Sequence, residues 1–334
     1  MGRSRVKKAV HFERPDAIPI WTEDICSDTF DKYGESLRQA LGDCPTDMIE
    51  LKYDPSADGP SRPEGEDEWG CVWKRLDGTV GQVVVHPMDG PAGYSKVRIP
   101  NPDAPGRFDE ARRRREEAGD VYAFGTNQFT LFERLRFLRG DCALLEDLCD
   151  ADVNLIRLID RLVEFNLRLL DHWKSVGVDC VRFTDDWGTQ QALFISPAMW
   201  REVFKPRYRT MFARAHELGM DVQFHSCGNV TAIVDDLIEC GMDILNPVQP
   251  GAMDVAATGR QFGGRVCCMG GIDTQQTLRR GSPADVRKEV ACTIRSLGRP
   301  EGGYLCCPAT TILEDVPLEN IRALFQSALD FSWR

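Results

Sequence analysis

The sequence predicts an α/β protein folded as a TIM (β/α)8 barrel, and three observations support this fold class. From Val121 onward, short apolar segments alternate with helical stretches of a dozen or more residues, which is typical of parallel βα units. Polar residues follow these apolar segments, at the edge where a barrel builds its active site. No GxGxxG motif follows the first apolar segment, which disfavours a doubly wound sheet, the alternative architecture. The eight predicted strands span residues 18–21, 47–53, 121–127, 180–186, 221–228, 244–250, 266–273 and 303–310.

The first third of the chain has a less regular pattern. A helix is predicted over residues 29–41, between the first two strands. The segment 54–105 is rich in Gly, Pro and Asp, and within it EWGCVWKRLDGTVGQVVVHP predicts a β-hairpin because a DG pair separates two apolar runs. We interpret this segment as an insertion covering one mouth of the barrel. A charged helix follows over residues 108–118, where acids flank four arginines, so a solvated helix face is favoured over a polyanion site.

The rest of the chain continues the alternation of strands and amphipathic helices. The clearest helices are predicted over residues 152–176 and 197–218. Because the strands and helices alternate without a break, we expect residues 1–334 to form a single barrel domain.

Composition and charge exclude several classes of function. The chain has 334 residues and a net charge of −11, which argues against nucleic-acid or anionic-membrane binding. No apolar run reaches the roughly 20 residues that span a bilayer. Thirteen cysteines without a secretory leader favour a reducing, cytoplasmic location over a disulfide framework. A homodimer is one arrangement that the sequence leaves open.

The strongest candidate for chemistry is an HxC pair at the end of a predicted strand. His225 and Cys227 are two residues apart, so both side chains project to the same side and can reach one ion. Imidazole and thiolate together suit zinc, and an open position would admit a substrate. The alternative is a packed cysteine beside a hydrogen-bonded histidine, and the spacing alone does not separate the two.

Acids end the neighbouring strand. Asp185 and Asp186 are adjacent, so they point in opposite directions and at most one enters the pocket, where it would accept a proton, ligate a metal or orient a substrate. Either acid can instead cap a helix. Trp187 and Gln190 follow them and are candidate substrate contacts.

Three further polar residues lie at the ends of later strands, and the last two predicted strands each contain a pair of adjacent cysteines, Cys267 with Cys268 and Cys306 with Cys307. Gln249, Asp273 and Gln275 are candidate substrate contacts, with helix capping as the competing role. Cys307 lies nearest the carboxyl end of its strand and is the predicted third thiolate, although free cysteine also packs as a small hydrophobe.

The motifs resemble a known family in order and wording. They are DDWGTQQALFISPAMWREVFKP, FHSCGNV, DILNPVQP, GGIDTQQTL, GGYLCCPATTI and DVPLENIRAL, which together cover most of the chain from about residue 140. This string resembles the uroporphyrinogen decarboxylase (URO-D) superfamily. The resemblance implies a TIM barrel and either a decarboxylase of haem biosynthesis or a cobalamin-dependent methyltransferase.

Two departures bear on the activity that the resemblance implies. The decarboxylase carries an arginine-rich MRQAGR segment for its tetrapyrrole, but this chain has WTEDICSDTF, with Glu23 and Asp24 in its place, so Glu23 is taken as a contact to a different substrate. The methyltransferases have a zinc site whose HxC pair matches His225 and Cys227. Their further cysteine, in coenzyme-M-type members, falls at Thr310. Cys307, Glu202, Asp186 or the substrate would then complete the set.

The sequence therefore predicts a zinc-dependent methyltransferase. It would move a methyl group between a small ether, amine or thiol and a corrinoid held by a partner protein, since no DxHxxG motif is present. The first alternative is a decarboxylase of a tetrapyrrole or smaller carboxylate, with Arg182, Lys52 and Arg136 as the basic groups. The second is a barrel without chemistry that serves as a binding subunit.

Overall fold

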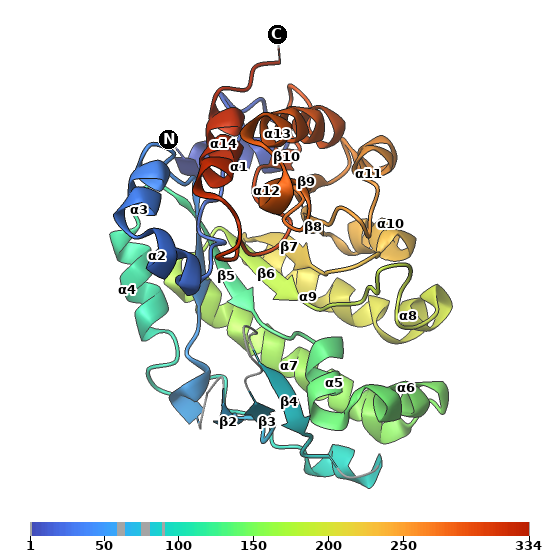
Figure 1. The fold of residues 1–334 in the computed structure, drawn as a ribbon. Coiled ribbons are helices and arrows are strands. Elements are labelled where there is room, and N and C mark those ends of the chain that lie inside the picture. Colours follow the sequence, from blue (N-terminus) through green and yellow to red (C-terminus); the bar gives the residue numbers. More distant parts are fainter. Residues whose placement is uncertain (1, 59–63, 75–80, 89–90, 334) are drawn as a thin grey trace.

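A curled parallel sheet organises the chain in the computed structural model, which describes residues 2–58, 64–74, 81–88 and 91–333 (Figure 1). The sheet has seven strands in the order β1-β5-β6-β7-β8-β9-β10, and all neighbours that pair do so in parallel. The α/β class and these seven predicted strands are therefore confirmed. Their bounds are β1 (Met48–Lys52), β5 (Tyr122–Asn127), β6 (Cys180–Thr184), β7 (Asp221–His225), β8 (Ile244–Val248), β9 (Cys267–Gly270) and β10 (Tyr304–Leu305).

The eighth predicted strand, residues 18–21, is reduced to one parallel bridge between Ile20 and Cys306. Trp21 N–H donates to the Cys306 carbonyl at 3.0 Å, and Cys306 N–H donates to the Pro19 carbonyl at 2.9 Å. Pro19 has no N–H and cannot extend this ladder. On the other side, a backbone bond of 2.9 Å joins Asp47 N–H to the Ile20 carbonyl, and Ile20 N–H donates to the Asp47 carboxylate at 3.0 Å. The described structure is thus a curled sheet of seven strands, and the prediction of eight full strands is wrong at this segment.

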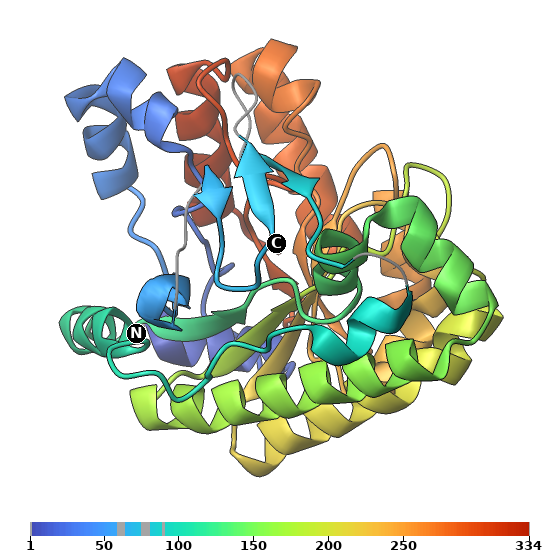
Figure 2. The ribbon, with the colours of Figure 1, turned by 90° about the horizontal axis from the view of Figure 1, so that it is seen from below.

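Helices cover the outer face of the curled sheet (Figures 1 and 2). The longest, α7 (Val153–Val176), begins after Asp152, whose carboxylate accepts the N–H groups of Asn154 and Leu155, and ends at Gly177 with φ of +83°. The remaining helices are α1 (Gly2–Val10), α2 (Ser27–Tyr33), α3 (Glu35–Gly42), α4 (Asp109–Glu117), α5 (Phe132–Arg139), α6 (Asp141–Cys149), α8 (Pro197–Val203), α9 (Lys205–Glu217), α10 (Thr231–Cys240), α11 (Val255–Phe262), α12 (Thr277–Arg280), α13 (Pro283–Leu297) and α14 (Leu318–Leu329).

Two helices that were predicted as continuous are each divided. The predicted helix 29–41 divides into α2 and α3 at Gly34, whose φ is +51°. The predicted helix 197–218 divides into α8 and α9 at Phe204, because Pro206 has no N–H to continue the ladder and restricts the residue before it. The charged helix predicted over 108–118 is confirmed as α4.

A small antiparallel sheet lies within the predicted insertion. It consists of β2 (Gly65–Glu66), β3 (Val72–Lys74) and β4 (Gln82–Val85), so the paired strands of the hairpin are confirmed, while its DG turn lies outside the described residues. Trp73 of β3 stacks on Phe129, which follows β5, at 6.2 Å between ring centroids. The small sheet therefore packs near the carboxyl end of the curled sheet. The single-domain assignment and the limits 54–105 stay predictions.

Candidate active site at the carboxyl ends of the strands

A compact group of three potential metal ligands lies at the carboxyl ends of β6 and β7. Asp186, His225 and Cys227 each offer one ligand atom, and these atoms all lie within 4.8 Å of one another. His225 Nε2 is 3.6 Å from Cys227 Sγ and 3.9 Å from Asp186 Oδ1. Nitrogen, sulfur and oxygen donors in one group form a ligand set that suits zinc, and three protein ligands leave a position for a substrate.

The protonation of His225 also fits a role as a metal ligand. Burial and the nearby Arg182 charge lower the pKa of His225 to about 4, so the imidazole is neutral near neutral pH. Its Nδ1 lies 2.6 Å from Asn246 Oδ1 and 2.7 Å from Arg182 Nη2. A proton on Nδ1 would donate to Asn246 Oδ1 and leave the Nε2 lone pair facing Cys227 and Asp186, whereas a hydrogen bond from Arg182 to Nδ1 requires the proton on Nε2, so these two neighbours favour opposite tautomers.

The thiol of Cys227 needs a cation to ionise. Burial, and next the Asp186 carboxylate, raise the pKa of Cys227 above its usual range. A divalent cation between these side chains would reverse that effect, because metal binding stabilises the thiolate. The backbone N–H of Cys227 donates to Asp186 Oδ1 at 2.7 Å, which links the two loops that carry the group.

The backbones of Gly188 and Gly228 approach each other closely where these two loops meet. A Cβ on Gly188 would lie 2.5 Å from Asn229 N and 2.7 Å from the Cys227 carbonyl oxygen. These contacts are with backbone, which cannot rotate away. Gly188 N–H also donates to the Cys227 carbonyl at 3.2 Å. The absence of a side chain at Gly188 therefore sets the separation of the loops bearing Asp186 and Cys227.

This packing predicts the effect of Gly188→Ala. The added methyl group should push the loops apart and lower the free energy of unfolding by about 1–3 kcal/mol. If Asp186, His225 and Cys227 hold zinc, it should also weaken zinc binding by roughly tenfold or more. Metal titration and urea unfolding measure the two effects. Gly42→Ala is the matched control, because nothing lies within 4 Å of a Cβ built there. Unchanged zinc affinity in Gly188→Ala would show that the close approach does not position the ligands.

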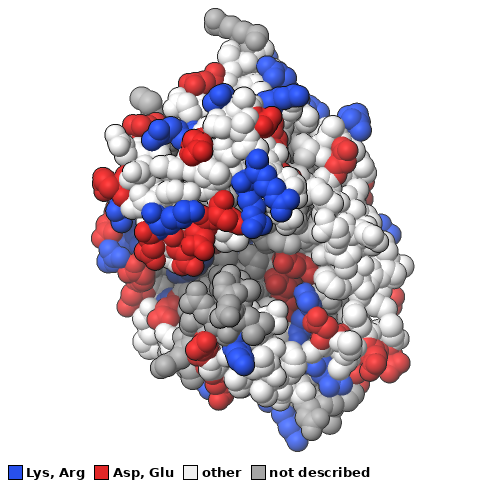
Figure 3. Space-filling view, viewed as in Figure 1, with Lys and Arg blue, Asp and Glu red and all other residues white. Residues whose placement is uncertain are grey.

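A cavity of about 320 Å³ opens beside the three residues. Side chains from successive strands line it, because the parallel register places residues near the carboxyl ends of these strands beside one another. Lys52 of β1 pairs with Thr126 of β5, and Thr126 pairs with Arg182 of β6. Thr310, the residue at the position of the further cysteine, also lines it. Figure 3 shows acidic side chains beside the hollow on this face.

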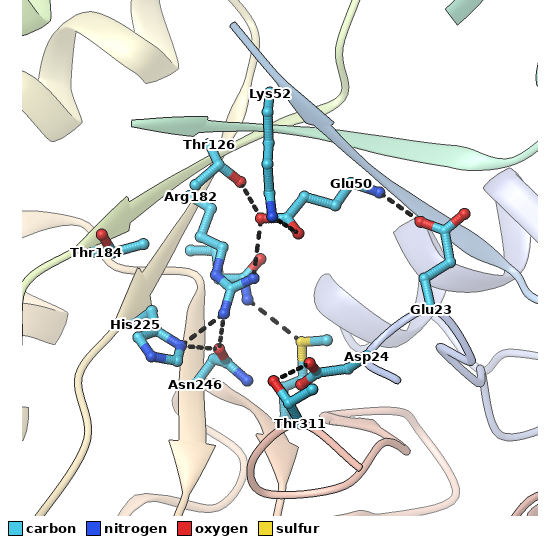
Figure 4. Close-up of polar contacts among 12 residues, drawn as sticks. Glu23, Asp24, Glu50, Lys52, Thr126, Arg182, Thr184, His225, Asn246 and Thr311 are labelled. Atoms are coloured by element: carbon cyan, nitrogen blue, oxygen red, sulfur yellow. Dashed lines mark hydrogen bonds and ion pairs between the residues drawn. The ribbon is translucent and has the colours of Figure 1, made fainter. Parts of the chain in front are cut away.

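Glu50 is the centre of a charged network in the cavity (Figure 4). Its Oε1 accepts hydrogen bonds from Thr126 Oγ1 at 2.6 Å and Arg182 Nη1 at 3.3 Å, and its Oε2 lies 3.2 Å from Lys52 Nζ. Burial raises the pKa of Glu50, but Arg182 and Lys52 outweigh it and lower the pKa below the usual value. Arg182 also donates to Asn246 Oδ1 at 3.2 Å, so Glu50 is connected to the His225 imidazole through Arg182.

The structure places Asp185 away from this cavity. Its carboxylate is fully buried and accepts the N–H groups of Leu131, Phe132 and Glu133 at the start of α5, together with the hydroxyl of Tyr208. Burial raises the pKa of Asp185 to about 6 against these hydrogen bonds. Asp185 and Asp186 thus point to different sides of the strand end, and only Asp186 lies with His225 and Cys227.

The other sequence-predicted residues also lie apart from the described cavity lining. Trp187 is buried, and its indole N–H donates to the Tyr208 hydroxyl. The Gln190 side-chain amide donates to the Gly251 carbonyl. The Gln249 side-chain oxygen accepts the backbone N–H of Gly228, which follows Cys227. The Asp273 carboxylate accepts two backbone N–H groups, one of them from the exposed Gln275. Glu23 accepts the Glu50 N–H, and Cys307 is fully buried in an apolar cluster.

Sequence reasoning missed several residues that the structure brings to the cavity. Glu50 and Thr126 lie within strands and have no motif around them, and Asn246 lies within the DILNPVQP motif, where Gln249 is the residue that the sequence analysis names. The strand register links these residues to ones that the sequence analysis names, because Asn246 pairs with His225 and Thr126 pairs with Arg182. Lys52 and Arg182 were considered only as groups for a decarboxylase.

Comparison with known proteins places the chain in a family. The sequence profile of uroporphyrinogen decarboxylase (URO-D) matches residues 77–331. The methylcobamide:CoM methyltransferase MtaA of Methanosarcina barkeri is 28% identical over 151 residues, which are 45% of this chain and 41% of that protein. A uroporphyrinogen decarboxylase of Xanthomonas euvesicatoria is 31% identical over 135 residues, 39% of this chain and 35% of that protein. The matches thus span about two fifths of the length of these relatives.

A solved structure supports the fold over nearly the whole chain. A methyltransferase from Methanosarcina mazei matches with a TM-score of 0.75 and 18% identity, covering 98% of both chains. At this identity the match is evidence of fold alone. Since the family profile covers more than half of the sequence and agrees with the motif resemblance, the chain belongs to the uroporphyrinogen decarboxylase family.

Proposed function

We propose that this protein is a zinc-dependent methyltransferase that moves a methyl group between a small methylated compound and a corrinoid protein. The observation that carries the proposal is the group of Asp186, His225 and Cys227 beside a cavity of about 320 Å³. The partial similarity to methylcobamide:CoM methyltransferase MtaA supports this reaction class. The proposal includes a TIM-barrel architecture, in which the bridge at Ile20 lies between β10 and β1 in place of an eighth strand, and a cytoplasmic location.

In this proposal three residues hold the metal and a fourth orients one of them. Asp186, His225 and Cys227 hold the metal, and Asn246 Oδ1 accepts a hydrogen bond from His225 Nδ1–H, which leaves the Nε2 lone pair free. Zinc, when bound, supplies a Lewis acid that lowers the charge build-up on the heteroatom of the methylated compound. In the demethylating direction, the bond from methyl to heteroatom would break with its electron pair kept by the heteroatom, which would take up a proton from solvent, while a corrinoid in the cobalt(I) state would supply the electron pair of the new carbon–cobalt bond.

The decarboxylase alternative has less support from the site. A polycarboxylate needs free basic groups, but each candidate cation already has an acidic partner. Arg182 and Lys52 contact Glu50, and Arg136 contacts Asp141 at 2.8 Å. Glu50 and Asp24 also line the cavity and would repel additional carboxylates. We therefore do not propose a tetrapyrrole substrate.

A direct assay tests the proposed reaction. Full-length protein loaded with zinc is incubated with methylcobalamin, as a surrogate for the corrinoid protein, and with a panel of small thiols, phenols and amines. Demethylation of methylcobalamin is followed by absorbance. We expect a rate with at least one acceptor class that falls roughly 100-fold or more when a chelator removes the metal. A rate that is indifferent to metal removal, or a protein that binds no zinc, would contradict the proposal.

A further inference from the structure

A second, larger cavity adjoins the candidate metal site. Its volume is about 1140 Å³, and it lies between the small antiparallel sheet and helices α5 and α6. Aromatic side chains dominate part of its lining: Trp69, Trp73, Phe129 and Phe137. Gln128, Phe129 and Glu133 line this cavity and also the smaller one beside His225. We call the larger cavity the aromatic chamber.

Arg134 lines the aromatic chamber as a buried cation, two of whose nitrogen atoms have no hydrogen-bonded acceptor among the described residues. Its side chain is 6% exposed, and among the described residues its Nε and Nη1 atoms have no hydrogen-bond partner. The nearest acid is Asp67, whose Oδ2 lies 3.9 Å from Nη1, which is beyond hydrogen-bond distance. Buried polar groups are normally paired, because burying an unpaired donor costs free energy.

Asp67 is already occupied by other donors. Its Oδ1 accepts the backbone N–H groups of Trp69 and Cys71, both at 2.9 Å, and its Oδ2 accepts Trp73 Nε1–H at 2.8 Å. These bonds hold the base of the small sheet. The carboxylate of Asp67 therefore offsets part of the Arg134 charge at a distance and does not satisfy its N–H groups.

The other cations in and behind the described lining already have acidic partners. Arg107 forms a doubly hydrogen-bonded pair with Glu68 at 3.2 and 2.8 Å, and Arg136 forms one with Asp141 at 2.8 and 2.9 Å. Arg134 differs from both in having an acid only at ion-pair distance. It is therefore the arginine of this lining that is available to an anionic group.

Aromatic rings stabilise Arg134 without using its hydrogen-bond donors. The guanidinium carbon lies 4.2 Å from the centroid of Trp69 and 5.4 Å from that of Phe129. Such contacts involve the face of the guanidinium, while the N–H groups point outward in its plane. A carboxylate fits this plane because it accepts two parallel N–H bonds.

We propose that the aromatic chamber binds a planar aromatic carboxylate. Arg134 holds the carboxylate, and the ring of the ligand packs among Trp73, Phe129 and Phe137, where it exchanges water for apolar contacts. The inference rests on the proposed function only in taking the ligand as the methyl donor, whose methyl-bearing end would reach the metal group past the shared residues Gln128, Phe129 and Glu133.

Binding of 4-methoxybenzoate to full-length, metal-free protein tests the inference, with its neutral counterpart 4-methoxybenzamide as the comparison. Titration calorimetry measures affinity, and quenching of tryptophan fluorescence reports on the chamber. We expect the acid to bind the wild-type protein at least roughly tenfold more tightly than the amide. We expect Arg134→Met to weaken binding of the acid by a similar factor and to leave binding of the amide nearly unchanged. Arg134→Lys should retain part of the preference for the acid.

Arg136→Met is the matched control, because Arg136 lines the same chamber but already binds Asp141. It should leave the affinity for the acid within a few-fold of the wild type. Equal affinity of the wild type for acid and amide, or no binding of the acid up to its solubility limit, would overturn the inference, and neither result depends on a variant that folds. Because the titrations use metal-free protein, their outcome is separate from zinc content and methyl transfer.

Discussion

His225→Ala is expected to reduce the zinc content of the purified protein from near-stoichiometric to almost none. His225 Nε2 lies 3.6 Å from Cys227 Sγ and 3.9 Å from Asp186 Oδ1, and its removal leaves two of the three protein ligands. We expect zinc affinity to fall by roughly 100-fold or more, beyond the effect of losing a group that only orients a ligand. Metal analysis of protein purified without chelator measures the change, and methyl transfer should be lost with the metal.

Three companion variants identify the ligand set. Cys227→Ala and Asp186→Ala should lose zinc as His225→Ala does, since each removes a member of the same group. Cys307→Ala should retain it, because the Cys307 thiol is fully buried in an apolar cluster and burial raises its pKa well above the usual value. Retention of zinc by His225→Ala would refute the proposed ligand set. Loss of zinc in a well-folded Cys307→Ala would support Cys307 as the third ligand that the sequence predicts.

Asp185→Ala is expected to destabilise the protein by about 3–5 kcal/mol, which is the second large effect. The carboxylate accepts three backbone N–H groups at the start of α5, at 2.7 to 3.0 Å, and the hydroxyl of Tyr208. Alanine would leave these donors buried without an acceptor and remove the cap of the helix. Urea unfolding of the full chain, followed by circular dichroism, measures the loss.

Tyr208→Phe is the matched control for Asp185. It removes one of the four donors and the bond from Trp187 Nε1, so we expect a loss of only about 1–2 kcal/mol. Zinc content of the folded fraction should be unchanged in both variants. If Asp185→Ala is as stable as the wild type and loses methyl transfer while it keeps zinc, Asp185 has the catalytic role that the sequence predicts for one of the two acids.

Much of the fold is predictable because its signals are local. Seven of the eight strands, α4 and α7 follow from apolar periodicity, turn residues and caps such as Asp152 and Gly177. The errors lie where a single residue interrupts a pattern. Pro206 divides the predicted helix 197–218, and Pro19 limits the first predicted strand to a bridge, although both prolines are visible in the sequence.

The candidate site is predictable only in part. His225 and Cys227 stand out because spacing of two places both side chains on one side of a strand, and Asp186 because it ends the neighbouring strand. Polar residues such as Gln190 and Asp273 look equivalent in sequence, but the structure shows them bonded to nearby backbone. The position of a polar residue at a strand end does not reveal which hydrogen bonds have already used its side chain.

The sequence by itself determined the family, the alternation of strands and helices, and the HxC pair, because motifs and periodicity are properties of neighbouring residues. Only the tertiary structure decided that Asp186 lies with this pair while Asp185 caps α5 and Cys307 is buried, and that Arg134 has no hydrogen-bonded acid among the described residues. These outcomes depend on register, on sheet curvature and on backbone contacts such as that of Gly188 with Gly228. Each of them joins segments that are distant in sequence, and the physical reason is that electrostatic and packing energies depend on distances in space.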